Sequence, residues 1–447
     1  MADAMKYYSM QDLTKLGIMT ILNDWNYWNR DFPKYTPRQE YQERMRLFRR
    51  SDEIIVLTGM RRSGKSTLLK QEMEDLAREH NKKKLLYINF EDPRFPTTLD
   101  CTTLDLILET YRENINPDEE IYLFLDEVQN VKSWEKWVVM AYELKKAIIY
   151  LTGSSSVLLS SEIASSISGR YLKIDVYPLT FQEYLKFNDI PCTNINEYTA
   201  NRIIINRLFT EYLTYGGFPK VAMLEEDLKK EEILSYFQTI LLRDIMGRYK
   251  LRNYDILLKL VEFLLTNDTK QNNIHSISKT LSISYETTHD YINYLKQVYF
   301  FFEVRNFNYS LKKQLASDLK YYALDTGFVN AVSFSFSENI GRLYENVVCN
   351  ALIRKGKQIF FFHDSTHECD FIIKEGTRIT AAVQVCYHLT EQNMKREIAG
   401  LISACHTFNL DTGYIITEQT SRMMEEDGLK MRIVPIVEFL LGLSSQD

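Results

Sequence analysis

The first third of the chain alternates short apolar runs with longer segments in which apolar residues recur at helical spacing. Strands that are apolar on both faces are typical of a parallel sheet, because helices cover both of its sides. The predicted strands are residues 53–58, 84–90, 121–125, 147–152 and 171–176. This pattern predicts an α/β core in which strands and helices alternate.

The spacing changes on both sides of this core. Helical segments flank it, and three short helices with a hairpin follow, with Ser284 as the N-cap of the third helix. The last segment begins with a helix over 338–355 and continues with strands near 359–362, 369–373 and 381–386. The predicted parts are an N-terminal helical segment (1–50), the core (51–180), a helical lid (181–250), a winged helix-turn-helix (251–335) and a C-terminal α/β domain (336–447).

A glycine-rich segment joins the first predicted strand to the next predicted helix. It consists of Gly59, Met60, Arg61, Arg62, Ser63, Gly64, Lys65 and Ser66, and Thr67 opens the helix. The two glycines let backbone N–H groups turn inward around an anion, which the helix N-terminus also attracts. Lys65 would then reach the β and γ phosphates of a nucleoside triphosphate, and Ser66 would offer its hydroxyl to Mg²⁺. The segment predicts a phosphate-binding loop.

Two carboxylates follow the buried strand 121–125, about sixty residues beyond this loop. Asp126 is placed to hold the metal together with Ser66. Glu127 is placed to polarise an attacking water as a general base. Together with the phosphate-binding loop, this acidic pair predicts hydrolysis of the bound triphosphate.

Three further residues are candidates for reading or neutralising the phosphates. Ser154 belongs to the small polar cluster 152–156, which is expected of a sensor at a strand end. Arg170 precedes the strand 171–176 and is a candidate for neutralising charge in a neighbouring subunit, or else an ordinary surface arginine. Arg243 in the predicted lid is either a phosphate contact within the same chain or part of a salt bridge with a carboxylate.

Composition excludes some classes of protein and leaves others. The formal net charge is −6, so contact with nucleic acid would need a local basic patch. The six cysteines show no zinc-type spacing, which is typical of reduced thiols. No signal-peptide pattern is visible, and no apolar run approaches the ~18 residues that cross a bilayer. We expect a cytoplasmic protein without a membrane segment.

The predicted winged helix-turn-helix leaves its partner open between DNA and protein. The expected exposed positions of its third helix carry little positive charge, whereas a phosphate-binding surface carries an excess. These positions are Glu286, Thr287, Asp290, Asn293 and Lys296. The best candidates for contacts with DNA phosphates are Arg305, Lys312 and Lys313, near the wing.

Taken together, the loop 59–66, the run 125–129, the run 151–155 and the pair Gly169–Arg170 resemble a family of prokaryotic AAA-type ATPases. Members of this family carry a C-terminal domain of unknown function, built as a winged helix followed by a restriction-endonuclease-like fold. The resemblance extends over nearly the whole chain. It implies ATP as the triphosphate and Mg²⁺ as the metal.

The C-terminal domain departs from the nuclease pattern at the positions that bind metal. Glu345 and Asp370 are present, but Gln384, Val385 and Cys386 stand where Glu-x-Lys is expected. A neutral amide is a poor ligand for Mg²⁺. We therefore predict a degenerate domain without nuclease activity, used for contact with DNA or for packing of subunits.

Three functions are compatible with this sequence. The leading hypothesis is a homo-oligomeric ATPase that couples its nucleotide state to a rearrangement on a partner, with double-stranded DNA as the candidate, bound by the C-terminal domains. The alternative is an ATP-dependent signalling or scaffold switch that acts on proteins. The third is an ATP-gated nuclease, which requires other residues in place of Gln384 and Cys386.

Overall fold

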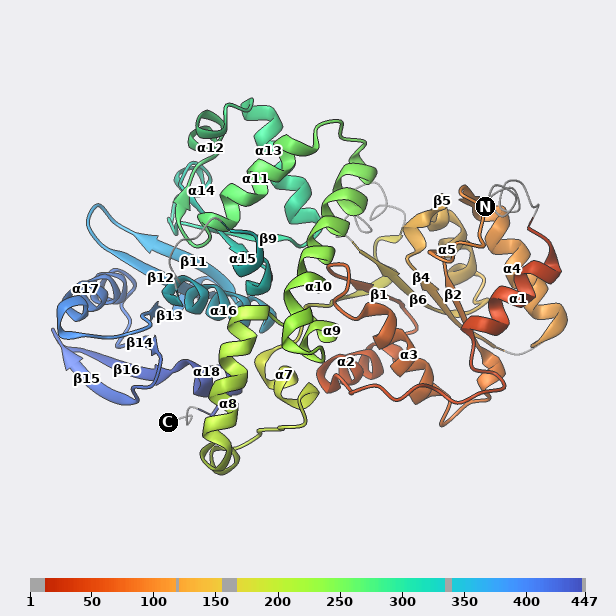
Figure 1. Ribbon diagram of the computed structural model, residues 1–447, viewed down its shortest axis with the longest axis horizontal. Coiled ribbons are helices and arrows are strands. Elements are labelled where there is room, and N and C mark those ends of the chain that lie inside the picture. Colours follow the sequence, from red (N-terminus) through yellow and green to blue (C-terminus); the bar gives the residue numbers. More distant parts are fainter. Residues whose placement is uncertain (1–12, 118–119, 155–166, 334–339, 444–447) are drawn as a thin grey trace. The chain divides into compact units, whose positions relative to one another are not determined.

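The computed structural model describes residues 13–117, 120–154, 167–333 and 340–443 (Figure 1). The chain divides into two compact units, Met1–Val176 and Tyr177–Asp447. Each unit has its own sheets and its own buried clusters.

The first unit contains a five-stranded parallel sheet with the strand order β2-β4-β6-β1-β7. Its strands are β1 (Ile54–Thr58), β2 (Leu85–Asn89), β4 (Tyr122–Asp126), β6 (Ile148–Gly153) and β7 (Tyr171–Asp175). The predicted parallel sheet is confirmed, with strand ends that differ by at most one residue from the prediction. Because parallel strands end at one edge, the segments that follow β1, β4 and β6 meet there.

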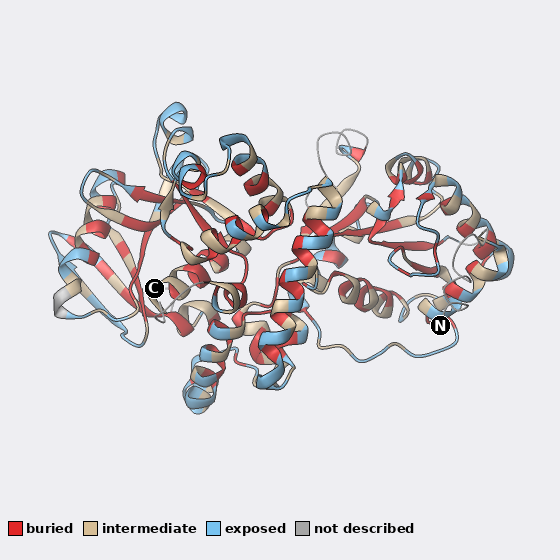
Figure 2. Cartoon of the chain, turned by 45° about the horizontal axis from the view of Figure 1, so that its top comes forward, coloured by how far each residue is buried: buried red, intermediate tan, exposed pale blue. Residues whose placement is uncertain are grey.

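Helices cover this sheet, and two short paired strands lie beside it. These elements are α1 (Lys15–Trp25), α2 (Gln39–Arg49), α3 (Lys65–Leu76), β3 (Leu99–Asp100), α4 (Cys101–Asn114), β5 (Val131–Lys132) and α5 (Trp134–Glu143). Alternate residues of β1 belong to different buried clusters, Ile54 and Val56 to one and Ile55 and Leu57 to the other. The strands are therefore buried on both faces, as Figure 2 shows, which explains their continuous apolar runs.

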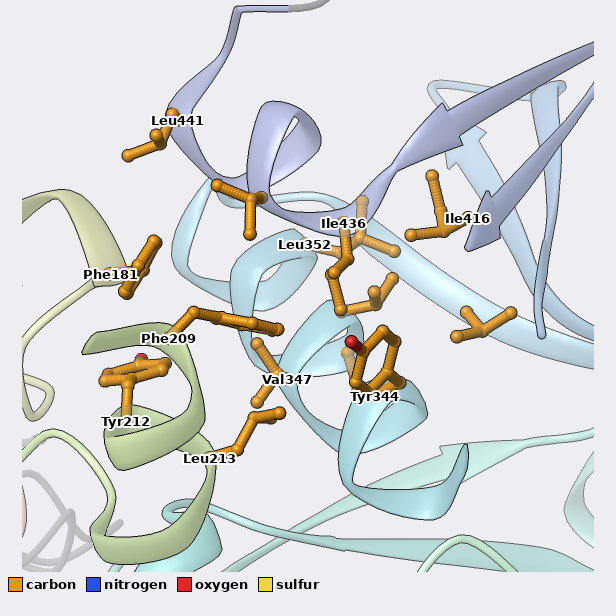
Figure 3. Close-up of a cluster of buried hydrophobic side chains, with 14 of the residues drawn as sticks. Phe181, Phe209, Tyr212, Leu213, Tyr344, Val347, Leu352, Ile416, Ile436 and Leu441 are labelled. Atoms are coloured by element: carbon orange, nitrogen blue, oxygen red, sulfur yellow. The ribbon is translucent and has the colours of Figure 1, made fainter. Parts of the chain in front are cut away.

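The second unit begins with helices α7 (Phe181–Phe187), α8 (Ile195–Tyr215), α9 (Pro219–Ala222) and α10 (Glu226–Thr239) and a π-helical segment (Ile240–Gly247). Residues of α7, α8 and α9 belong to a buried cluster that they share with the C-terminal part of the unit. Phe209 of α8 contacts Phe181 of α7 and Tyr344 of α16 (Ile340–Arg354) through edge-on ring contacts (Figure 3). The helices of the predicted lid thus pack as part of the second unit.

The three predicted helices lie in the middle of the second unit as α11 (Tyr254–Thr266), α12 (Ile274–Leu281) and α13 (Tyr285–Gln297). Two helices that the sequence did not predict, α14 (Leu311–Leu315) and α15 (Thr326–Val332), follow them. A three-stranded antiparallel sheet has the order β8-β10-β9, formed by β8 (Gln271–Asn272), β9 (Phe301–Arg305) and β10 (Leu319–Ala323). The Ser284 side chain accepts a hydrogen bond from the backbone N–H of Thr287, so Ser284 caps α13 as predicted.

The C-terminal part contains a six-stranded mixed sheet with the order β11-β12-β13-β14-β16-β15. Its strands are β11 (Gln358–His363), β12 (Glu368–Glu375), β13 (Arg378–Val385), β14 (Thr412–Thr417), β15 (Arg422–Glu426) and β16 (Leu429–Pro435). Two more helices, α17 (Glu391–Phe408) and α18 (Ile436–Leu441), complete it. The sequence predicted the first three strands and missed the other three. Among the described helices of the chain, none is both long and apolar enough to cross a membrane.

Candidate nucleotide-binding site

The glycine-rich loop lies between the end of β1 and the start of α3. Gly59 has a φ of 149°, and a Cβ atom at this position would lie 2.1 Å from the carbonyl oxygen of Val176. Gly64 has a φ of 101° and precedes the first turn of α3. The backbone conformation therefore requires glycine at both positions. At Gly59 the close approach of Val176, the residue directly after β7, also excludes a side chain.

Lys65 is buried, with 4% of its surface exposed. Its Nζ donates to the carbonyl oxygens of Gly59 at 3.0 Å and Met60 at 3.1 Å, and it lies 3.8 Å from Oε1 of Glu127. The ammonium group is thus held inside the loop, beside the predicted general base. Ser66 and Thr67 occupy the first turn of α3, which follows directly.

Polar groups in this loop fit an anionic ligand. Ser63 is fully buried, and its hydroxyl has no hydrogen-bond partner among the described residues. A buried hydroxyl without a partner costs free energy, which a ligand that bonds to it recovers. The backbone carbonyl of Ser63 accepts a hydrogen bond of 3.0 Å from Nη1 of Arg38. Because Arg38 belongs to the N-terminal segment, this bond connects that segment to the loop.

The two arginines of the loop differ in their surroundings. Arg61 donates to both carboxylate oxygens of Glu91, at 2.9 and 3.1 Å. Glu91 lies just beyond the end of β2. Arg62 adopts a left-handed backbone conformation, with a φ of 69°.

The Asp126 carboxylate ends β4 and is held by two hydroxyl groups from neighbouring strands. Its Oδ2 accepts a hydrogen bond of 2.5 Å from the hydroxyl of Tyr87 on β2. Its Oδ1 accepts a hydrogen bond from the hydroxyl of Thr152 on β6. Burial and the Asp126 charge together raise the pKa of Tyr87 well above its usual value, so Tyr87 remains a donor. Tyr87 could not be predicted from the sequence, because its contact with Asp126 depends on β2 lying next to β4 in the sheet.

Glu127 adopts a left-handed backbone conformation with a φ of 56°. Its backbone N–H donates to the hydroxyl of Thr152 at 2.9 Å, so Thr152 contacts both acidic residues. Oε2 of Glu127 accepts a hydrogen bond of 2.5 Å from Nε2 of Gln129. Burial raises the pKa of Glu127, while the nearby Lys65 charge opposes the shift. A carboxylate with a raised pKa close to a buried ammonium group is suited to accept a proton.

The other sequence candidates lie at different places. Ser154 is buried directly after β6, and the rest of the polar cluster, residues 155–156, lies outside the described residues. Thr152, the first residue of this cluster, contacts both Asp126 and Glu127. Arg170 forms an ion pair of 2.7 Å with Glu143, and both side chains are exposed.

Arg243 lies in the π-helical segment of the second unit. Its side chain is exposed. Within the described ranges of the chain, no ion pair joins it to a carboxylate.

A second cluster of charged residues lies in the C-terminal part of the second unit. Lys320 of β10 is buried, and its Nζ lies 2.9 Å from Glu345 of α16 and 2.6 and 3.4 Å from Glu368 and Asp370 of β12. Burial alone would lower the pKa of Lys320, but the three carboxylates outweigh it and raise the pKa. An ammonium group therefore sits between the predicted metal-binding carboxylates.

This cluster borders a cavity of about 640 Å³ that is lined by Glu345, Asp370, Gln384 and Glu397, among other residues. Gln384 donates a hydrogen bond of 2.8 Å to Glu397 of α17. Within the described ranges, no group of three or more His, Cys, Asp or Glu side chains is arranged to hold a metal ion. Neither Lys320 nor Glu397 was identified from the sequence, because each comes from an element outside the expected motif.

Three family models match the chain. They are an AAA domain at residues 51–185, a domain of unknown function (DUF8612) at residues 206–339 and a domain of unknown function (DUF4143) at residues 340–439. The AAA match covers the parallel sheet and its phosphate-binding loop. The two other matches lie within the second unit.

Relatives of similar length occur in an archaeon and a bacterium. The uncharacterized protein MJ1544 of Methanocaldococcus jannaschii is 34% identical over 372 residues, covering 80% of each chain. An uncharacterized protein of Haemophilus influenzae is 29% identical over 410 residues, covering 90% of this chain and 98% of that one.

Among solved structures, the Walker-type ATPase paby2304 of Pyrococcus abyssi matches with a TM-score of 0.43 and 15% identity, over 68% of this chain and 99% of that one. DnaA from Aquifex aeolicus, bound to AMPPCP, matches with a TM-score of 0.25 and 13% identity, over 62% of this chain and 92% of that one. The AAA domain match and the relatives, together with the geometry of the loop, assign the family. The chain belongs to the prokaryotic AAA-type P-loop ATPases that carry a C-terminal domain of unknown function.

Proposed function

We propose that the first unit binds ATP together with Mg²⁺ and hydrolyses the γ-phosphate. The observation that carries this proposal is the convergence of Lys65, Asp126 and Glu127 at one edge of the sheet, with 3.8 Å between the Lys65 ammonium and the Glu127 carboxylate. These are the groups that phosphoryl transfer to water requires. Their arrangement is supported by hydrogen bonds from Tyr87 and Thr152.

Each residue has a separate task in this mechanism. The backbone N–H groups of the loop and the Lys65 ammonium bind the phosphates, for which Lys65 exchanges its bonds to the loop carbonyls. Glu127 accepts a proton from the attacking water. Mg²⁺, held by Ser66 and Asp126, would supply positive charge that neutralises the phosphate oxygens.

Replacement of Glu127 separates binding from turnover. Glu127→Gln should retain ATP binding and lower the rate of hydrolysis by about 100-fold or more, because the amide cannot accept the proton. Lys65→Ala should weaken ATP binding instead. Calorimetry with ATP and a phosphate-release assay measure the two effects. Undiminished hydrolysis by the Glu127→Gln variant, or unchanged affinity of the Lys65→Ala variant, would contradict these roles.

We further propose that the nucleotide state rearranges the second unit on a partner. Exposed Lys312 and Lys313 of α14 support DNA as this partner. Another observation favours the second candidate, a signalling or scaffold switch that acts on proteins. The predicted phosphate contact Arg305 and the basic residue Lys296 of α13 both form ion pairs with Glu303, which offsets their charge.

The partner can be tested by the response to double-stranded DNA. For a DNA partner we expect the ATPase rate to rise with DNA, and retention of DNA to fall by about tenfold or more between low and high salt. The Lys312→Ala/Lys313→Ala variant should lose much of this retention. Lys357→Ala, at an exposed ion pair with Glu375, is the control for loss of a surface lysine. Absence of both stimulation and salt-sensitive retention would assign the partner to protein.

A further inference from the structure

We propose that Gln129 is a positioning residue that orients the Glu127 carboxylate for its reaction with water. This inference rests on the proposed ATP hydrolysis. It adds a residue that is outside the phosphate-binding loop and outside the acidic pair, and it names the contact through which that residue acts.

Hydrogen bonds hold both the backbone and the side-chain carboxylate of Glu127. The left-handed backbone, with a φ of 56°, costs about 1 kcal/mol or more for a residue with a side chain, and the hydrogen bond from its N–H to Thr152 holds it there. Glu127 is followed at once by the 3₁₀ turn Val128–Asn130, which places Gln129 beside it. The amide of Gln129 then binds Oε2 at 2.5 Å. One contact holds the backbone and the other holds the carboxylate.

This second contact matters because of Lys65. Oε1 of Glu127 lies 3.8 Å from the Lys65 ammonium, and both groups are largely buried. Buried opposite charges at this distance attract strongly. Without a restraint on Oε2, the carboxylate would turn toward the ammonium and form a closer ion pair. Such a pair would draw the base away from water and the lysine away from phosphate. The Gln129 bond opposes this rotation.

A glutamine can also serve both protonation states of the base. Its Nε2 donates to the ionised carboxylate, and after a half-turn of the amide its Oε1 accepts from the protonated one. Oε1 of Gln129 is buried and has no hydrogen-bond partner within the described ranges, so no competing bond opposes the half-turn. Leucine at this position provides neither contact, and glutamate provides no donor when ionised.

The test compares Gln129→Leu and Gln129→Glu with the wild type and with Asn130→Leu. Asn130 is exposed in the same 3₁₀ turn and serves as the matched control. ATP affinity, kcat and KM are measured with the full chain, and thermal melting confirms folding of each variant. We expect kcat to fall by about 10-fold or more for both Gln129 variants, with ATP affinity within about twofold, because a lost hydrogen bond to a charged group at the reacting carboxylate is of this size.

The split between kcat and KM gives a readout that a merely structural role would not move. Loss of the donor leaves the phosphate contacts in place, so kcat should fall in Gln129→Leu while KM stays within about twofold. Asn130→Leu should retain the wild-type kcat and KM. Wild-type kcat in both Gln129 variants would overturn the inference, while the proposed function would stand.

A measurement without turnover separates failure of the inference from failure of the proposed function. Carbon-13 labelling of the glutamate carboxyl groups, with the Glu127→Gln variant for assignment, gives the carboxyl NMR signal of Glu127 at a single pH in the nucleotide-free protein. Gln129→Leu should shift this signal, because the carboxylate loses its hydrogen bond, and Asn130→Leu should leave it in place. An unchanged signal in Gln129→Leu would refute the contact. A shifted signal in a protein that binds but never hydrolyses ATP would refute the proposed function alone.

Discussion

At the scale of single residues, the Asp126 carboxylate has both oxygens engaged by hydroxyl groups from different strands. Tyr87 donates from β2 and Thr152 from β6. These bonds fix the direction in which the carboxylate can offer its remaining lone pairs. A metal ligand that is oriented in this way binds its ion more tightly, because less freedom is lost on binding.

Replacement of Tyr87 by Phe should therefore weaken the response to Mg²⁺. The Mg²⁺ concentration for half-maximal hydrolysis should rise about 3- to 10-fold, which corresponds to one lost hydrogen bond, while ATP binding without Mg²⁺ stays unchanged. A Mg²⁺ titration of ATPase activity measures the effect. Tyr122→Phe is the control, because Tyr122 contributes its hydroxyl to His80 rather than to Asp126. Equal Mg²⁺ requirements for the wild type and Tyr87→Phe would contradict the role.

Some site residues were predictable from the sequence and others were not, for a physical reason. Asp126 ends its strand, Glu127 follows it directly, and Lys65 follows its glycine, so local spacing identifies all three. Tyr87 and Thr152 act across strands, and their contacts depend on the order β2-β4-β6, which local spacing does not contain. Their roles became visible only with the sheet.

At the scale of elements, Lys320 connects three parts of the second unit. It projects from β10 and binds carboxylates of α16 and β12. A buried charge that loses its partner is costly, whereas an exposed pair contributes little. This cluster is therefore expected to link the three-stranded sheet to the six-stranded sheet.

Lys320→Ala should lower the free energy of unfolding of the second unit by about 3 kcal/mol or more, since the carboxylates lose their cation. The pKa of Asp370 is raised even with Lys320 in place, first by burial and then by Glu345. Without Lys320 that pKa rises further, so protonation relieves the repulsion at low pH and the loss should be smaller at pH 5 than at pH 8. Denaturant unfolding at both pH values measures it. Lys357→Ala, at an exposed pair, should cost about 1 kcal/mol or less. Equal losses for the two variants would contradict the linking role.

The elements that the sequence missed have weak local patterns. β15 pairs at the edge of the six-stranded sheet, and its residues Arg422–Glu426 are mostly exposed and charged, so no apolar run marks it. The buried strands of the first unit are the opposite case, and their apolar runs located them closely. The sequence predicts a helical lid over 181–250, the region that contains α8, but it does not say which partner covers the apolar face of α8, and that partner includes Tyr344 of α16.

At the scale of the whole molecule, Arg170 bears on assembly. Its exposed side chain is paired with an exposed Glu143, and such a pair is weak enough to exchange for a stronger anion. If Arg170 acts on a neighbouring subunit, a mixture of Arg170→Ala and Glu127→Gln chains should recover part of the ATPase activity that each lacks alone. At an interface between the two kinds of chain, Arg170 of the Glu127→Gln chain would then act at the site that retains Glu127 in the Arg170→Ala chain. Phosphate release by the mixture measures this recovery.

The control mixture combines Arg170→Ala with the Glu127→Gln/Arg170→Ala double variant, which contains no intact Arg170. It should show no recovery. Sedimentation of the wild type with ATP determines whether subunits associate under the same conditions. A monomeric protein, or a first mixture that behaves like the control, would contradict action in trans.

The bonds of Lys65 to its own loop have a consequence for the cycle as a whole. A buried ammonium group with no acceptor would destabilise the molecule. Here the carbonyl oxygens of Gly59 and Met60 are its acceptors. In the proposed cycle of ATP binding and hydrolysis, these bonds would keep the loop folded whenever phosphate does not contact Lys65.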